Sequence, residues 1–182
     1  IAPSLVGSEM CIRDRNGSTA MAKQHYRDGD MFMFYAMSRD LGGIDSLAFT
    51  SAKQPLTWSC HPEHIDIAKV ELAKPLPSGG RVVLETPFRV DIPSGSISRL
   101  GHVGESYQIT QWFPKPAVYD HEGWHPMPYL SQGEFFSEYG SYDVKITLPA
   151  NYTVGATGDL VPGSEDNDAE KSRLDSLAAD TK

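Results

Sequence analysis

Apolar and polar residues alternate along the middle of the chain, and this alternation is the strongest structural signal in the sequence. Between positions 81 and 92 the apolar residues fall on even positions: Val82, Leu84, Phe88, Val90 and Ile92. A period of two is that of a β-strand with one buried face. The pattern therefore predicts a strand over Arg81–Ile92 whose even-numbered side chains face the core.

Weaker alternation predicts further strands on both sides of this one. Leu47 and Phe49 precede the turn Lys53-Gln54-Pro55, and Leu56 and Trp58 follow it, which is the pattern of a β-hairpin. The remaining predicted strands cover residues 65–72, 107–113, 142–148 and 152–156. The sequence thus indicates a mainly β fold, an antiparallel sheet domain of saddle-like or sandwich-like form, with one or two short helices.

Helices and loops occupy the remaining segments. Good helix formers after Ser18 and Thr19 predict a helix that reaches Tyr26, and a thin apolar stripe predicts another over residues 168–179. The apolar run Met31–Met37 is too short to classify by its period and predicts a strand or a buried loop. Glycine, serine and proline predict loops over residues 94–104 and, in irregular form, over residues 114–133.

Composition and charge restrict the classes of partner. The chain has 182 residues, enough for a single domain, and its 16 basic against 24 acidic side chains give a net charge of −8. Such a chain has no basic field to hold nucleic acid. No apolar run approaches the roughly 20 residues that a membrane-spanning helix needs.

The first fifteen residues do not fit the rest of the chain. They contain Met10-Cys11-Ile12-Arg13-Asp14-Arg15, which resembles a translated sequencing adaptor. We therefore expect residues 1–15 to be an artefact that makes no specific contact, and residues 16–182 to be the native part. We also expect both ends to be cut, with the first strands of the domain missing upstream.

One string matches a metallopeptidase motif letter for letter. His121-Glu122-Gly123-Trp124-His125 satisfies H-E-x-x-H, whose two histidines reach one zinc ion only when they share a helix face. Gly123 and Pro126 disfavour a helix here. We therefore interpret His121, Glu122 and His125 as a coincidental match and expect no metal site, with the two imidazoles pointing apart and Trp124 packed on the sheet.

Two other groups of polar residues have simpler explanations. Cys60-His61-Pro62-Glu63-His64 holds metal-type ligands, but no second cysteine of the native part could complete a site, so a turn before a strand is the better interpretation. Glu134 and Glu138 flank Phe135-Phe136 and are expected at the rim of an apolar cluster rather than as an acid–base pair.

The stretch Tyr107-Gln-Ile-Thr-Gln-Trp-Phe-Pro-Lys-Pro-Ala-Val-Tyr-Asp-His-Glu-Gly-Trp-His-Pro-Met-Pro-Tyr-Leu130 resembles the amino-terminal β domain of the aminopeptidase N family of zinc metallopeptidases, in its Bacteroidetes-type branch. Tyr142–Pro149 and Tyr152–Gly158 extend the resemblance, which spans about residues 16–180. In that family a saddle-shaped β domain precedes a catalytic domain that holds the zinc. The resemblance implies that this chain carries no cofactor itself, that zinc belongs to the missing catalytic domain, and that the catalytic domain and a peptide substrate are its partners.

The resemblance also implies one site residue. The family's β domain has a Thr-Gln pair at a strand end, and its glutamine reaches the free α-amine of the substrate. Thr110-Gln111 matches that pair, although the family's later A-R-x-x-F-P string lacks its arginine here. Gln111 is thus the candidate substrate-binding residue of a non-catalytic domain fragment, and whether the chain belongs to an active enzyme stays open.

A different class of function is also open. Ten aromatic residues between Tyr107 and Tyr142 would suit a carbohydrate-binding or protein-binding β module, or they would staple the long loop onto a sheet, which is the more common case. The cellular location is not fixed by the sequence; an exported parent protein, periplasmic or extracellular, is compatible with it.

Overall fold

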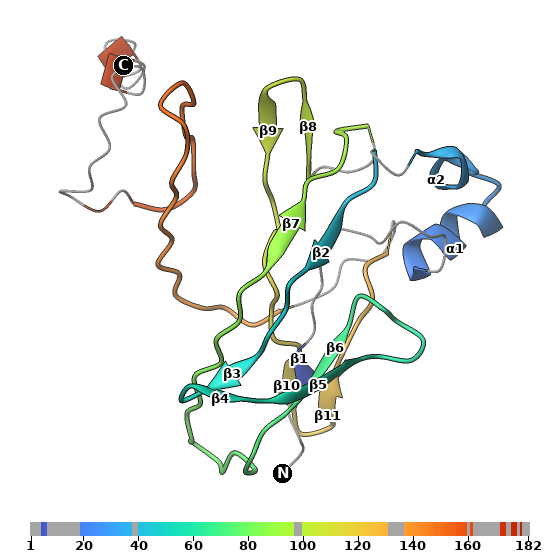
Figure 1. The fold of residues 1–182 in the computed structure, drawn as a ribbon, viewed down its shortest axis with the longest axis vertical. Helices are drawn as coiled ribbons and strands as arrows, with labels where there is room; N and C mark the ends of the chain where they lie inside the picture. The colour runs from blue at the N-terminus through green and yellow to red at the C-terminus, as the bar shows by residue number, and fades with distance from the viewer. Residues whose placement is uncertain are drawn as a thin grey trace. The chain divides into compact units, whose positions relative to one another are not determined.

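The computed structural model describes residues 5–6, 19–37, 40–96, 100–130, 137–159, 161, 172–173, 176–177 and 179. Strands in several small antiparallel sheets dominate it, as predicted (Figure 1). The chain divides into two units, Ile1–Tyr139 and Gly140–Lys182. All described strands and the two helices of the first half of the chain belong to the first unit, and the described residues of the second unit include short helical stretches.

A three-stranded sheet has β6 (Ala68–Glu71) at its centre, between β1 (Leu5–Val6) and β5 (Thr57–Cys60). β6 is shorter than the strand predicted over residues 65–72. Ala68 and Val70 are buried, so the strand keeps the predicted inward face. Leu5 pairs with Lys69 and Val6 with Ala68. The expectation that residues 1–15 make no specific contact is therefore wrong for these two residues.

The predicted hairpin is confirmed. Strands β3 (Thr50–Ser51) and β4 (Gln54–Pro55) pair in antiparallel register, and Leu56 N–H donates to the Phe49 carbonyl at 2.9 Å. The turn lies one residue earlier than expected, at Ala52 and Lys53, whose φ angles are 49° and 63°. Two consecutive positive φ angles give the turn the twist that joins tightly paired strands.

The predicted strand over residues 81–92 is only partly regular. Strand β7 covers Arg89–Asp91 and pairs with β2 (Gly43–Asp45), while Glu85 makes an isolated antiparallel bridge to Thr50. Burial alternates as predicted from residue 84 to residue 90: the even positions, including the polar Thr86, are half-buried, and the odd positions are exposed. The prediction fails at Val82, which is 39% exposed, because no strand among the described residues pairs with that end of the segment.

Two small apolar clusters hold this unit together. Phe49, Ala68 and Val70 are buried, and Trp58 lies edge-on to Phe49 with ring centroids 5.6 Å apart. Leu100 is fully buried among Ile44, Val90, Trp112 and Tyr129. The first cluster draws on residues 47–84 and the second on residues 44–129, so each joins segments that are separated in sequence.

The helix predicted at residues 18–26 is present as α1 (Ala20–Arg27), with Thr19 Oγ1 accepting from Ala22 N–H at 3.2 Å as its N-cap. The run Met31–Met37 was predicted wrongly as a strand or buried loop. It contains the one-turn helix α2 (Phe32–Tyr35), and Phe34 and Tyr35 are 62% and 76% exposed. An apolar run without a period does not reveal whether its side chains are buried.

The predicted glycine and serine loop contains a strand. β8 (Gly101–Val103) pairs with β9 (Ser106–Gln108), which overlaps only the first two residues of the predicted strand 107–113. Gly101 packs so closely on the Gly95 backbone that an added Cβ would lie 2.6 Å from Gly95 Cα. Glycine at residue 101 is therefore required by this contact between two chain segments.

The second unit keeps its predicted turn but not its predicted sheet. Tyr152 N–H donates to the Pro149 carbonyl at 3.1 Å, which closes the turn. Residues 142–148 and 152–156 have no ladder partner among the described residues, and Tyr142, Val144, Ile146 and Leu148 are about half exposed or more. Ser172, Arg173, Ser176, Leu177 and Ala179 are helical, as predicted for residues 168–179.

Candidate functional site

The H-E-x-x-H string lies on a β-hairpin. β10 (Val118–Asp120) and β11 (Gly123–His125) pair in antiparallel register, joined by a turn at His121 and Glu122. The segment is not helical, as predicted, but it is more regular than the irregular loop expected over residues 114–133. Asp120 at the first turn position and Gly123 at the last favour a tight turn, and this pattern would have predicted the hairpin.

Asp120 organises that turn. Its Oδ1 accepts from Glu122 N–H at 2.8 Å and from His125 Nε2 at 2.8 Å. The hydrogen bond from His125, followed by that from the Glu122 amide, holds the pKa of Asp120 below its ordinary value of 3.8. The carboxylate is therefore a fixed acceptor that closes the hairpin.

The three residues of the motif do not converge on one point. His125 is bonded to Asp120, whereas the side chain of His121 is 87% exposed and lies 3.9 Å from the carboxylate of Glu122. Among the described residues, no three His, Cys, Asp or Glu side chains are grouped to hold a metal ion. Trp124 packs on Tyr119 of the facing strand, with ring centroids 4.9 Å apart.

Gln111 lies three residues beyond the end of β9 in an unusual backbone conformation. Its φ is 50°, in the left-handed region, and its side chain is half-buried. The preceding Thr110 has a buried hydroxyl without a hydrogen-bond partner. Glutamine has neither the small size of glycine nor the short polar side chain of asparagine that eases this conformation, so residue 111 is a strained position.

The Cys60–His64 segment is a turn before a strand, as interpreted from the sequence. His61 Nδ1 accepts from the N–H groups of Glu63 and His64, each at 3.2 Å, and the rings of His61 and His64 stack with centroids 5.1 Å apart. The Ile67 carbonyl accepts from His61 N–H at 2.7 Å. These contacts assign His61 a structural role. Of the other two candidates, Glu138 is exposed and Glu134 lies outside the described residues.

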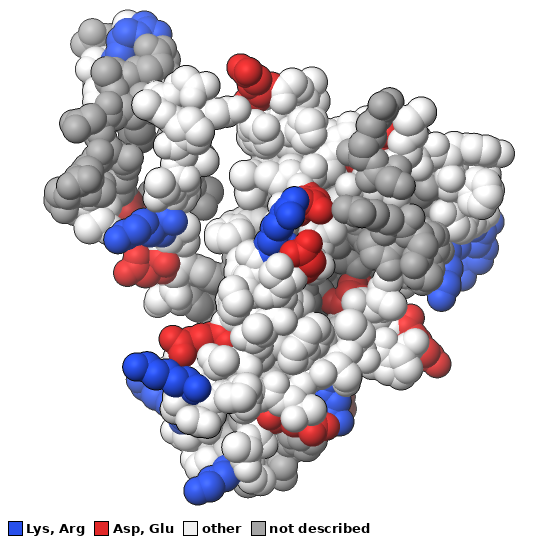
Figure 2. Space-filling model, in the orientation of Figure 1, with Lys and Arg blue, Asp and Glu red and all other residues white. Residues whose placement is uncertain are grey.

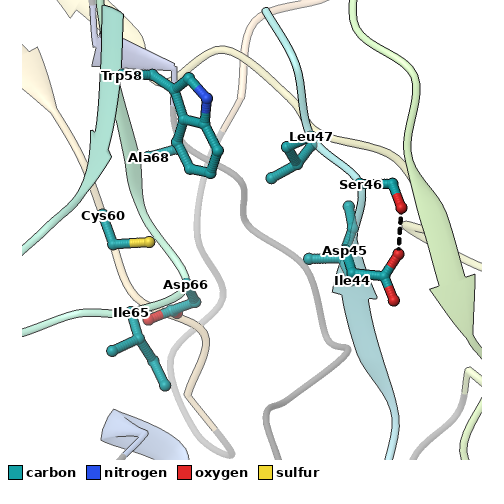
Figure 3. Close-up of a pocket in the computed structure, with 9 residues that line it drawn as sticks. All are labelled: Ile44, Asp45, Ser46, Leu47, Trp58, Cys60, Ile65, Asp66 and Ala68. Atoms are coloured by element: carbon teal, nitrogen blue, oxygen red, sulfur yellow. Dashed lines mark hydrogen bonds between the residues drawn. The ribbon is translucent and has the colours of Figure 1, made fainter.

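A groove that the sequence did not reveal lies between β2 and the β5–β6 sheet (Figure 3). It has a volume of about 240 Å³ and is lined by Ile44, Asp45, Ser46, Leu47, Trp58, Cys60, Ile65, Asp66 and Ala68. Figure 3 shows Trp58 and Leu47 extending toward each other from opposite walls, with the Cys60 thiol directed into the space between them. The groove depends on pairing between distant segments, so no local motif predicts it.

Two carboxylates belong to the groove. Asp66 is only 5% exposed, and its Oδ2 accepts from Tyr129 N–H at 2.8 Å. Asp45 is exposed, and its Oδ1 accepts from Ser46 Oγ at 2.6 Å. Figure 3 shows the Asp45 carboxylate and the Ser46 hydroxyl on the side of β2 that faces away from Trp58, so mainly apolar groups face the space between the two walls.

The described surface gives little support to other classes of site. Figure 2 shows acidic and basic side chains interspersed on the face in view, without a large patch of one sign. In the described part of the chain, no helix is long and apolar enough to cross a membrane. No protein-family model, curated protein or solved structure matches the chain.

Proposed function

We propose that this chain is part of the amino-terminal β domain of a zinc aminopeptidase, where it packs on a catalytic domain and shapes the entrance for peptide substrates. The domain itself carries no catalytic group in this proposal. Support comes from the mainly antiparallel β fold and from the sequence resemblance over residues 107–130, 142–149 and 152–158.

The conformation of Gln111 is the observation that carries the proposal. A left-handed φ at a half-buried glutamine costs free energy, and such strain is found most often where a side chain must be held in one orientation for a ligand. The amide oxygen of Gln111 is a suitable acceptor for a substrate ammonium group. In this proposal Gln111 binds the free amino terminus of the peptide substrate and takes no part in bond cleavage.

A second candidate, a carbohydrate-binding or protein-binding module, is supported by exposed aromatic rings. Tyr107 and Tyr119 are 47% and 50% exposed, and each ring is supported by a neighbour: His102 stacks on Tyr107 at 5.5 Å, and Trp124 packs on Tyr119. Rings held this way present a rigid face to a sugar or an apolar side chain. In this case the chain would act without any peptidase partner.

The test uses the full-length protein encoded by the reading frame to which this chain belongs. We expect it to release the amino acid from an alanine or leucine chromogenic anilide. Gln111→Ala should lower kcat/KM by about tenfold or more, mostly through KM, because a hydrogen bond to a charged group contributes about 1.5–3 kcal/mol. Gln108→Ala, on the exposed end of β9, is the matched control and should not change kcat/KM.

Two results would reject the proposal. One is a full-length protein without hydrolytic activity, which would leave the binding module. The other is equal kcat/KM for wild type, Gln111→Ala and Gln108→Ala, which would assign Gln111 a structural role only. Because Gln111→Gly relieves the left-handed strain, that variant should fold at least as stably as wild type while still losing the amide, so misfolding is separable from lost binding.

A further inference from the structure

We propose that residues 140–148 pair in antiparallel register with the same segment of a second copy of this chain, with Val144 at the centre of the pairing. The inference goes beyond the proposed function and does not depend on it, because Gln111 lies outside this segment. It stands on three features of the segment: its exposed apolar side, its position outside any ladder, and the match of charges that this register produces.

The segment has the pattern of a strand but belongs to no sheet in the described structure. Its apolar side chains fall on even positions and are each about half exposed or more: Tyr142, Val144, Ile146 and Leu148. Residues 143–148 have no ladder partner among the described residues, and the chain turns at Pro149, in the orange part of Figure 1. Backbone N–H and C=O groups outside a ladder are available to a pairing strand.

Charge selects the partner and the register. Asp143 and Lys145 are two residues apart, and both are exposed on the polar side of the segment. Antiparallel pairing centred on Val144 places Asp143 of each copy opposite Lys145 of the other, so an ion pair forms on each side of the centre. Pairing centred on residue 143 or on residue 145 places like charges opposite each other, and so does parallel pairing in register.

The same register also matches the neighbouring side chains. On the apolar side, Tyr142 faces Ile146 of the other copy, which is an aromatic and β-branched pair, and Val144 faces Val144. On the polar side, Ser141 faces Thr147. A shift by one residue would place apolar opposite polar side chains along the whole ladder. Pattern and charge therefore agree on one register.

The second copy also supplies the strands that a stable sheet needs. Residues 152–156 follow the turn and alternate again, with Tyr152, Val154 and Ala156 on even positions. Two copies joined through residues 140–148 form a central pair of strands to which residues 152–156 of each copy can add. Three or more strands with a shared apolar face are stable, whereas an isolated two-stranded hairpin is marginal.

Association is measured on the purified 182-residue chain by sedimentation velocity over a concentration series. We expect a monomer–dimer equilibrium with a Kd of about 10–100 μM. Lys145→Asp places carboxylates opposite each other on both sides of the centre and should weaken dimerisation by about tenfold or more. Lys74→Asp makes the same change of charge at an exposed bend of the first unit and should leave the Kd unchanged.

A charge swap separates direct pairing from a general effect of charge. Asp143→Lys alone should also weaken dimerisation, because lysines then face each other. The double variant Asp143→Lys/Lys145→Asp restores opposite charges in the antiparallel register and should return the Kd to within about threefold of wild type. An equimolar mixture of the two single variants should form a heterodimer at concentrations where each variant alone is mostly monomeric.

A symmetric cross-link tests the centre of the register. Cys11→Ser and Cys60→Ser remove both native cysteines. In that background Val144→Cys should be joined to its own copy by a short bismaleimide at concentrations above the Kd. Val83→Cys, at a side chain that is 69% exposed in the first unit, is the matched control and should cross-link only at the background rate.

Three outcomes would overturn the proposal. The wild-type chain could stay monomeric up to about 1 mM, which would mean that a different chain or segment covers this face. The double variant could dimerise no more tightly than either single variant. Finally, Lys74→Asp could weaken association as much as Lys145→Asp does. Thermal unfolding shows whether each variant has folded, and we expect all to fold because every substituted charge is exposed.

Discussion

His125 Nε2 donates a 2.8 Å hydrogen bond to Asp120 Oδ1 across the end of the β10–β11 hairpin. The same oxygen accepts from the Glu122 amide inside the turn. The histidine that completes the H-E-x-x-H string therefore serves the hairpin, and its ring is oriented by a carboxylate that the zinc motif does not include.

The first prediction concerns the acid stability of this hairpin. The pKa of Asp120 is lowered in the folded state, so its contribution to stability is present above the ordinary value of 3.8 and is lost as pH falls through the lowered pKa. Asp120→Asn should therefore destabilise the chain near neutral pH, and the difference from wild type should shrink below pH 3.8. Urea denaturation of both proteins at neutral and acidic pH measures this difference in the free energy of unfolding.

His125→Ala is the companion variant, because the hydrogen bond from His125 is the largest cause of the lowered pKa of Asp120. At neutral pH, His125→Ala should lose most of the stability that Asp120→Asn loses. The assigned role of this carboxylate would be contradicted if the free energies of unfolding of wild type and Asp120→Asn differed by the same amount at neutral and acidic pH.

The second prediction concerns the smaller apolar cluster. Leu100→Ala should lower the free energy of unfolding by about 2–5 kcal/mol, because Leu100 is fully buried and its removal leaves a cavity among Ile44, Val90 and Trp112. Leu148→Ala makes the same chemical change at a side chain that is 49% exposed and should cost less than about 0.5 kcal/mol. Chemical denaturation measures both; equal costs would show that Leu100 does not lie in a packed core.

The third prediction concerns the contact between Gly95 and Gly101. Gly101→Ala should destabilise the chain by about 1–3 kcal/mol, because the added methyl group meets backbone atoms that cannot move independently. Gly43→Ala is the control, since a Cβ at Gly43 meets nothing within 4 Å. Its stability should change by less than about 0.5 kcal/mol, and a Gly43→Ala effect as large as that of Gly101→Ala would refute the close approach.

The fourth prediction concerns zinc. The purified chain should retain no stoichiometric zinc after dialysis and should release no amino acid from an aminoacyl anilide, because His121 and His125 engage different carboxylates on a β-hairpin. Elemental analysis and a chromogenic assay measure these outcomes. One equivalent of zinc that is lost on His121→Ala would overturn this prediction and make the chain a candidate enzyme.

Local chemistry explains which elements the sequence predicted well. Thr19 caps α1 through its own hydroxyl, and the β3–β4 turn joins neighbouring strands, so both depend on residues close in sequence. The alternating burial from Leu84 to Val90 is likewise visible in the sequence. Each of these features is encoded within about ten residues.

Features that depend on distant partners were missed. The strand at Gly101–Val103 was also missed although its partners are local, because glycine and serine favour a loop there while β9 and the bridge from Ser94 to His102 supply the pairing. The apolar run at Phe32–Tyr35 is contacted by α1, where Tyr26 and Phe34 have ring centroids 6.1 Å apart, but Phe34 and Tyr35 stay mostly exposed. Gln111 was found through a family resemblance alone, because a positive φ at glutamine has no sequence signature.

The β3–β4 hairpin, with its two-residue turn at Ala52 and Lys53, is expected to form before the β2–β7 ladder. The ladder between β3 and β4 closes over two residues, and such hairpins form within about 1–10 μs. Ile44 pairs with Val90 across the whole intervening segment, so the β2–β7 ladder carries a much larger loop-closure entropy. During synthesis β2 therefore emerges before its partner β7, and the ladder between them closes only after the segment that separates them has been made.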